Sequence, residues 1–224
     1  MFLFDALCDT LRMSEGGAAQ IIEGLWCFEA LHPEWTEDEG GEDGWEPAVA
    51  WWAVATAGGV VLIDPLVDDW DPVDRLVADA GGAVGVVRTC HWHQRSIAEV
   101  AGRYDAEIWA KPDPDGRPRP ARDHSVGDGD ELFDALRVID VERADEIALW
   151  LPRQRALVFG DAMIRVRDGE LRPCPESWTQ PTGGPGRLRT LLGALSDLPV
   201  EHVLVSHGPL VLGDGLLSLR SATS

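Results

Sequence analysis

The sequence predicts a single domain of the mixed α/β class, with strands and helices packed in layers. Two observations support this class. Short apolar runs of strand length recur along the chain, and segments with helical periodicity lie between some of them. With 224 residues, 45% of them hydrophobic, the chain is long enough for one sizeable core and short for two domains. We expect one domain at residues 21–224 after an N-terminal extension at residues 1–20.

The predicted elements follow from these patterns in chain order. Strands are expected at residues 22–28, 48–55, 60–63, 83–87, 107–110, 136–141, 147–151, 156–159 and 202–205. Helices are expected at residues 72–80, 96–104 and 187–196. Asp71 before Pro72 is expected to cap the first helix. Trp51 and Trp52 should face opposite sides of their strand, since side chains alternate there. Residues 111–130, rich in Pro, Gly, Asp and Arg, should form a surface loop.

Two histidines follow the apolar run at residues 83–87 and give the first indication of chemistry. In an extended segment His91 and His93 point to the same side, where they can share one cation while Trp92 turns back into the protein. The carboxyl ends of strands are where ligands collect in open α/β sheets. A pair with this spacing is more often a hydrogen-bonded surface feature, so its meaning depends on the other strand ends.

Three further apolar runs end on a residue able to bind a metal. They end at Asp64, at Gly160-Asp161 and at His207-Gly208. The two glycines lack a side chain, so that backbone or ligand can approach closely. Taken singly, each of these residues is best interpreted as a turn residue at the end of a strand. Their joint occurrence points to one site.

This ordered set resembles the metallo-β-lactamase superfamily. Its members carry an Asp-ending strand, an H-x-H-x-D-H loop, a middle histidine, a Gly-Asp and a late histidine followed by glycine. The resemblance covers about residues 21–215. It implies a four-layer αββα sandwich and places the family's residues, in order, at Asp64, His91, His93, Asp161 and His207.

The chain departs from this pattern at two places. Arg95 and Ser96 stand where the family has an aspartate and a histidine of its second metal position. Glu142 falls where the middle histidine is expected, which leaves the third ligand open. We therefore expect a degenerate site that holds at most one metal.

Nitrogen and carboxylate donors suit zinc with an open position, or ferrous iron. The expected ligands are His91, His93, Glu142, Asp161 and His207. Asp64 and Asp161 are the expected catalytic residues, and Arg95 and Trp92 the expected substrate contacts. Arg95 would neutralise Asp161 or bind an anionic substrate group. The alternative is that Arg95 replaces the lost cation in a metal-free ion pair.

The composition limits the partners. The net charge is −20, with 39 acidic residues against 19 basic ones, which argues against nucleic acid and anionic membrane as partners. The acidic stretch at residues 37–44 should be a solvated loop, although an early loop often covers the site in the resembled fold. A small-molecule substrate is the expected partner, and the sequence leaves the oligomeric state open.

Four cysteines without a C-x-x-C pair are expected to be reduced thiols in a cytoplasmic protein. Cys90, next to His91, is either a reactive or ligating thiol or a small buried residue at a strand end, and the second interpretation is favoured. The N-terminus lacks the features of a signal peptide, and no apolar run reaches membrane-spanning length.

Two functions remain open. The first is a hydrolase with one metal, which acts on an ester, thioester, lactone or phosphoester. The second is a catalytically inactive protein that keeps the fold as a binding or regulatory module. The loss of the family's aspartate and histidine at positions 95 and 96 favours the second function, whereas the joint retention of the five family residues favours the first.

Overall fold

The computed structural model describes residues 18–40, 44–82, 84–112, 123–141, 146–165, 169–178 and 185–224. Within these residues the first sheet has its strands in chain order: β1 (Ala18–Ile22), β2 (Leu25–Leu31), β3 (Ala48–Thr56), β4 (Gly59–Ile63), β5 (Val84–Arg88), β6 (Glu107–Ala110) and β7 (Asp123–Ser125). The second sheet has the order β15 (Val211–Leu212), β14 (His202–Val205), β11 (Ala156–Phe159), β10 (Ile147–Leu151), β9 (Leu136–Asp140) and β8 (Glu131–Leu132).

Helices and short elements complete the described fold. The α-helices are α2 (Trp70–Asp79), α3 (Ile97–Tyr104), α4 (Pro185–Ala194) and α5 (Gly215–Thr223). Three 3₁₀ turns are η1 (Glu37–Glu39), η2 (Glu176–Trp178) and η3 (Leu195–Asp197), and β12 (Met163–Arg165) pairs with β13 (Leu171–Pro173). Among the described residues, no helix has both the length and the apolar character needed to cross a bilayer.

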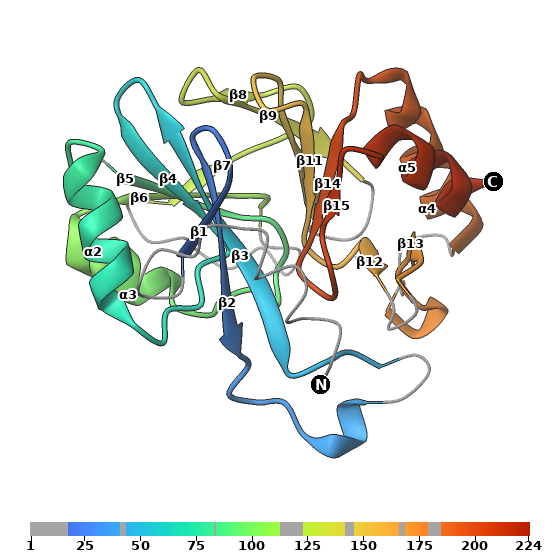
Figure 1. Cartoon of the computed structure of the whole chain (residues 1–224), viewed down its shortest axis with the longest axis horizontal. Coiled ribbons are helices and arrows are strands. Elements are labelled where there is room, and N and C mark those ends of the chain that lie inside the picture. The colour runs from blue at the N-terminus through green and yellow to red at the C-terminus, as the bar shows by residue number, and fades with distance from the viewer. Residues whose placement is uncertain are drawn as a thin grey trace.

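The elements form four layers. Figure 1 shows α2 and α3 on one side of the molecule and α4 and α5 on the opposite side, with the two sheets between them. Three separate clusters of buried apolar side chains fill the spaces: one between the sheets, one between the first sheet and α2 and α3, and one between the second sheet and α4 and α5. The expected αββα sandwich is confirmed.

The alternation of side chains along a strand explains how one strand serves two cores. On β3, Trp52 lies in the core between the sheets, and its neighbour Trp51 lies in the core under α2 and α3. On β10, Leu149 and Trp150 divide in the same way between the two faces of the second sheet. Strands buried on both faces read as continuous apolar runs, which made them recognisable from the sequence.

The parallel strand pairs determine where the functional residues meet. β4 pairs in parallel with β5, and β11 pairs in parallel with β14. The carboxyl ends of each pair therefore lie at one edge of their sheet. The backbones of Ala50 on β3 and Ser206 after β14 are joined by a hydrogen bond of 2.9 Å from the amide of Ala50, which brings the two sheets together at this edge.

Some expected boundaries were wrong. The strand expected at residues 22–28 is two strands, β1 and β2, because the chain turns at Gly24, whose φ of 72° favours glycine. Helix α2 begins at Trp70, and Asp69 rather than Asp71 caps it, since its carboxylate accepts a hydrogen bond from the Asp71 amide at 3.0 Å. The short strands β7, β8, β12, β13 and β15 were not expected. The expected extension lies mostly outside the described residues, and residues 18–20 belong to β1.

Gly208 is required for the turn that follows β14. Its φ is 98°, and a Cβ atom there would overlap the carbonyl oxygen of Arg165 and lie 2.8 Å from its carbonyl carbon. We expect Gly208→Ala to lower the free energy of unfolding by about 1–3 kcal/mol, from backbone strain and this overlap. Urea unfolding followed by tryptophan fluorescence measures the change.

Gly102 provides the matched control for this substitution. It lies exposed on α3, and a Cβ atom added there would meet no other atom within 4 Å, so that Gly102→Ala should raise the unfolding free energy by about 0.5–1 kcal/mol. Equal stabilities of Gly208→Ala and the parent protein would contradict the left-handed backbone at Gly208.

Candidate metal centre

Side chains from four strand ends meet where the two sheets approach each other. Asp64 follows β4, Cys90 and His93 follow β5, Asp161 follows β11 and His207 follows β14. Asp64, His93 and Asp161 are almost fully buried, with exposed fractions of 0%, 4% and 6%. Ionisable groups this deep are rare unless they are paired, so their partners decide what the site does.

Asp64 holds the ring of His93. Its Oδ2 lies 2.7 Å from His93 Nδ1, and its Oδ1 accepts a hydrogen bond of 2.7 Å from the Thr89 amide. The Thr89 hydroxyl also donates to Asp64 Oδ2. With Nδ1–H donated to Asp64, the other ring nitrogen, Nε2, is directed to Asp161 at 3.1 Å. A carboxylate behind an imidazole in this way is the usual support of a metal-binding histidine.

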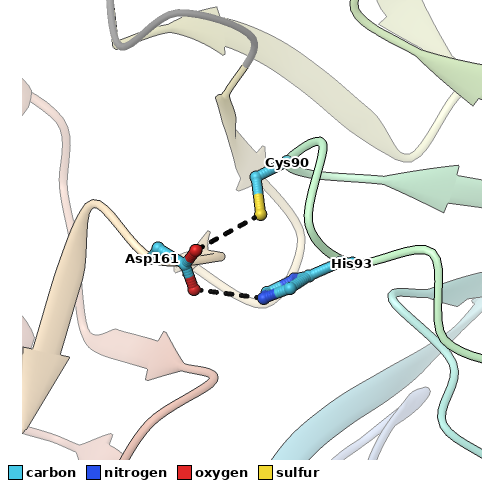
Figure 2. Close-up of side chains that lie close together, drawn as sticks. All are labelled: Cys90, His93 and Asp161. Atoms are coloured by element: carbon cyan, nitrogen blue, oxygen red, sulfur yellow. Dashed lines mark hydrogen bonds and ion pairs between the residues drawn. The ribbon is translucent and has the colours of Figure 1, made fainter. Parts of the chain in front are cut away.

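Cys90, His93 and Asp161 form a cluster of three potential metal ligands. One donor atom from each lies within 4.8 Å of the other two. The Cys90 thiol donates to Asp161 Oδ2 at 3.5 Å, and His93 Nε2 lies 3.1 Å from Asp161 Oδ1 (Figure 2). Thiolate, imidazole and carboxylate are all zinc ligands. The donor set of this cluster therefore fits one zinc ion.

His207 flanks the cluster through Asp161. Its Nε2 lies 3.1 Å from Asp161 Oδ1, whereas its ring centre is 6.3 Å from that of His93. Burial lowers the pKa of His207 despite the hydrogen bond and the charge of Asp161, which favours a neutral ring that donates from Nε2. Its Nδ1 atom is buried without a hydrogen-bond partner among the described residues.

Glu146 fixes the loop that carries Asp161. One oxygen of its fully buried carboxylate accepts hydrogen bonds from the amides of Asp161 and Ala162, at 2.8 and 2.6 Å. A Cβ atom on the preceding residue, Gly160, would overlap the Thr89 hydroxyl and lie 3.4 Å from the His93 ring. The absence of a side chain at Gly160 thus allows the two loops to approach each other, as its sequence position indicated.

Arg95 places a fixed positive charge in the same region. Its guanidinium donates hydrogen bonds to the carbonyls of Ala50 (3.3 Å) and Asp64 (3.1 Å) and to the Ser206 hydroxyl (2.8 Å). One of its nitrogens also lies 3.3 Å from His93 Nε2. Arg95 therefore joins both sheets beside the ligand cluster, and its hydrogen bonds hold the protein together at this edge.

The buried carboxylates control the protonation of His93. Burial and the Arg95 charge favour the neutral ring, but the charges of Asp64 and Asp161 outweigh them and raise the pKa of His93 to about 9. The pKa of Asp161 lies well below its usual value. Burial alone would raise this pKa, but the charge of His93 and the hydrogen bond from His207 outweigh the effect of burial. Without a metal, the charges of Asp64, Asp161, His93 and Arg95 sum to zero at neutral pH.

The structure separates the two histidines that the sequence had paired. The chain turns directly after β5, and the His93 amide donates to the Cys90 carbonyl at 3.2 Å. In such a turn residues three apart, not two apart, come together. His91 is half-buried outside the cluster with its ring centre 5.3 Å from that of Trp92. The expectation that Trp92 turns back into the protein was wrong, since 66% of its surface is exposed.

Two residues near this edge, Thr89 and Glu146, have positioning roles that were not predicted. Glu142, the expected ligand, lies outside the described residues, and Glu146, four positions later, is the buried glutamate that holds the Asp161 loop. Cys90 is buried at the end of its strand, as the favoured interpretation expected, and it also lies among three potential metal ligands. The signals available were a polar Thr-Cys pair directly after an apolar strand and a glutamate directly before one.

The sequence matches no protein-family model and no curated protein. Solved structures are similar. The metallo-β-lactamase DIM-1 superimposes with a TM-score of 0.66 at 16% identity and covers 92% of this chain and 95% of its own. The mono-zinc form of the metallo-β-lactamase FIM-1 from Pseudomonas aeruginosa gives 0.63 at 15% identity, over 92% of this chain and 93% of that one.

A third similar structure is TTHA1623 in a di-iron-bound form. Its TM-score is 0.57 at 20% identity, and the match covers 83% of this chain and 96% of that chain. Identities this low establish the architecture and not the chemistry. The layers, the sheet order and these superpositions together show that the chain has the metallo-β-lactamase fold.

Proposed function

We propose that the protein is a hydrolase that depends on one divalent metal ion bound by Cys90, His93 and Asp161. The observation that carries this proposal is the convergence of three ligands of suitable chemistry at the strand ends. Proteins of the same fold have been solved in mono-zinc and di-iron-bound forms, which supports a metal at this edge. The three proposed ligands are one thiolate, one imidazole and one carboxylate. Such a set suits zinc better than iron, so zinc is the proposed ion.

The separations of the donor atoms support this assignment. Four ligands at about 2.0–2.3 Å around zinc stand roughly 3.3–3.7 Å apart at tetrahedral angles. Asp161 contacts His93 through Oδ1 at 3.1 Å and Cys90 through Oδ2 at 3.5 Å, and one donor atom from each of the three residues lies within 4.8 Å of the other two. A three-residue set leaves a fourth position for water or substrate, which is typical of catalytic rather than structural zinc.

Each residue of the site has a distinct proposed role. The metal, when bound, lowers the pKa of a water molecule so that hydroxide is available near neutral pH. Asp64 orients the His93 ring, and Glu146 holds the Asp161 loop. His207, neutral and hydrogen-bonded to Asp161, positions this carboxylate. Arg95 offsets the negative charge of the buried carboxylates where the family has its second metal position.

The substrate class stays a prediction. An ester, thioester, lactone or phosphoester is proposed because a metal-activated hydroxide attacks carbonyl and phosphoryl centres alike. The role predicted for Trp92 as a substrate contact also stays a prediction, whereas the ligand set proposed here does not include His91. We further propose a small-molecule substrate. The net charge of −20 supports the absence of a nucleic-acid or membrane partner, and cysteines without a C-x-x-C pair support a cytoplasmic location.

A second function, a catalytically inactive binding module, is favoured by one specific observation. The charges of Asp64, Asp161, His93 and Arg95 balance without a metal, because His93 bridges the two carboxylates as a cation. These four groups therefore need no ion to balance their charges. Measurements of metal content and activity distinguish the two functions.

The choice of ligands is tested by removing each histidine in turn. We expect His93→Ala to abolish tight zinc binding, because it removes a cluster ligand, whereas His91→Ala should retain one zinc per chain. Elemental analysis of protein purified without a histidine tag gives the stoichiometry. Cys90→Ser should weaken binding, with Cys27→Ser, buried between the sheets, as the matched control. Retention of zinc by His93→Ala would place the ion elsewhere.

The affinity for zinc should depend on pH. Because the pKa of His93 is about 9 in the metal-free protein, a proton occupies the ligand at neutral pH and must leave when the metal binds. Lower pH favours this proton, so that apparent affinity falls by about tenfold per pH unit for each proton displaced. Competition with a chelator at several values between about pH 6.5 and 9 measures it. A constant affinity would contradict the exchange.

Hydrolysis is tested with a panel of aryl esters, thioesters, lactones and phosphodiesters. The zinc-loaded protein should hydrolyse at least one class, and the chelated protein should lose this activity and regain it with zinc. Asp64→Asn should weaken metal binding or activity by about 10- to 100-fold, as loss of a ligand's supporting carboxylate usually does. Full zinc loading with no activity on any class would favour the inactive binding module.

A further inference from the structure

A cavity of about 260 Å³ lies next to the metal centre. It is lined by Asp38, Glu39, Gly40, Gly44, Trp45 and Trp178, which come from η1, the segment before β3, and η2. Pockets that bury an entire small ligand typically measure about 300–1,000 Å³. The cavity is therefore of a size for one end of a substrate rather than the whole molecule.

The Trp45 indole in the wall is held in place before any ligand arrives. The indole Nε1 donates to Glu39 Oε2 at 3.2 Å, and the backbone carbonyl of Trp45 accepts a hydrogen bond of 2.9 Å from the Trp35 indole. The His32 ring stands edge-on to it, with ring centres 5.1 Å apart. A wall fixed in this way loses little conformational entropy when it binds a ligand.

His207 lies between two residues of the cavity wall and the proposed active site. The rings of Trp45 and Trp178 lie on this imidazole nearly at right angles, with centre-to-centre distances of 5.2 and 5.6 Å. His207 Nε2 in turn contacts Asp161 at 3.1 Å. One imidazole ring thus lies between the cavity wall and the ligand cluster, so that the cavity is close to the proposed site of reaction.

The chemistry of the lining selects the charge of the ligand. The two indole faces are electron-rich and attract cations, most strongly where water is excluded. Asp38 and Glu39 add negative charge at the rim, and the residues that line the cavity in the described part of the chain include no Lys or Arg. An anionic group there would meet repulsion from both carboxylates. A quaternary ammonium group suits such walls because it needs no hydrogen-bond acceptor.

We infer that this cavity binds the cationic end of the substrate, an alkylammonium or quaternary ammonium group, and so places the bond to be hydrolysed at the metal centre. The inference rests on the proposed hydrolase function for the placement of the bond. The binding of the cation itself needs no metal, and the two can be tested separately.

The test compares choline with its neutral isostere, 3,3-dimethylbutan-1-ol, on the chelated full-length protein. Calorimetric and fluorescence titrations should show that choline binds and that the neutral alcohol binds about tenfold more weakly, since the shapes match and only the charge differs. Equal affinities would show an apolar cavity without charge selection and would overturn the inference. If choline does not bind, the proposal that this cavity is a cation-binding site is wrong.

Variants locate the binding. Trp178→Leu and Asp38→Asn should each weaken choline binding by about 2- to 30-fold while leaving the neutral alcohol little changed. The controls Trp70→Leu and Asp79→Asn carry the same changes on α2, in the layer beneath the first sheet, and should leave choline binding unaltered. Equal effects of the cavity variants and the controls would contradict the assignment.

A final measurement separates this inference from the proposed function. The zinc-loaded protein is given paired ester or thioester substrates that differ only in a trimethylammonium or a tert-butyl end. Higher kcat/KM for the cationic member, with competitive inhibition by choline, supports both ideas. Choline binding without hydrolysis of any substrate overturns the hydrolase alone, and hydrolysis with no preference for the cation overturns the cation site alone.

Discussion

The interaction of one buried imidazole with two buried carboxylates organises the functional edge of this protein. Asp64 comes from the first sheet, Asp161 from the second, and His93 lies between them at 2.7 and 3.1 Å. Neither carboxylate has appreciable contact with water, so that each needs a positive partner to remain charged. The two sheets must therefore meet in one register at this edge, and the glycine at position 160 permits the approach.

Much of this arrangement follows from the sequence, for physical reasons. Strands buried on both faces, such as those ending before Asp64 and Asp161, must be apolar throughout. The first pairs in parallel with β5 and the second with β14, so that the carboxyl ends of each pair lie at one edge of their sheet. The chemistry at the end of β5 did not follow. A run of polar residues after a strand does not reveal whether it stays extended, and the turn from Cys90 to His93 reverses which side chains share a face. Glu146 was missed because a single glutamate before a strand has no distinctive spacing.

Charge balance explains how the same residues suit two states. Without metal, a protonated His93 and Arg95 offset Asp64 and Asp161. In the proposed metal-bound state, neutral His93 and a Cys90 thiolate would be ligands of a divalent ion, and the charges of these residues and the ion would again sum to zero. The proposed binding would thus exchange two protons for one ion at constant net charge among these groups, which would avoid the large desolvation cost of an unbalanced buried charge. A cationic substrate beside Trp45 and Trp178 would add positive charge only outside this balanced core.

Arg95 combines two roles that a single substitution would remove together. Its guanidinium joins Ala50 of the first sheet to Ser206 of the second, and it also supplies positive charge beside two buried carboxylates. An aspartate at this position alone would remove the bridge and add negative charge in the same space. The contact between the sheets and the charge of the site are therefore not independent properties, because the same side chain determines both.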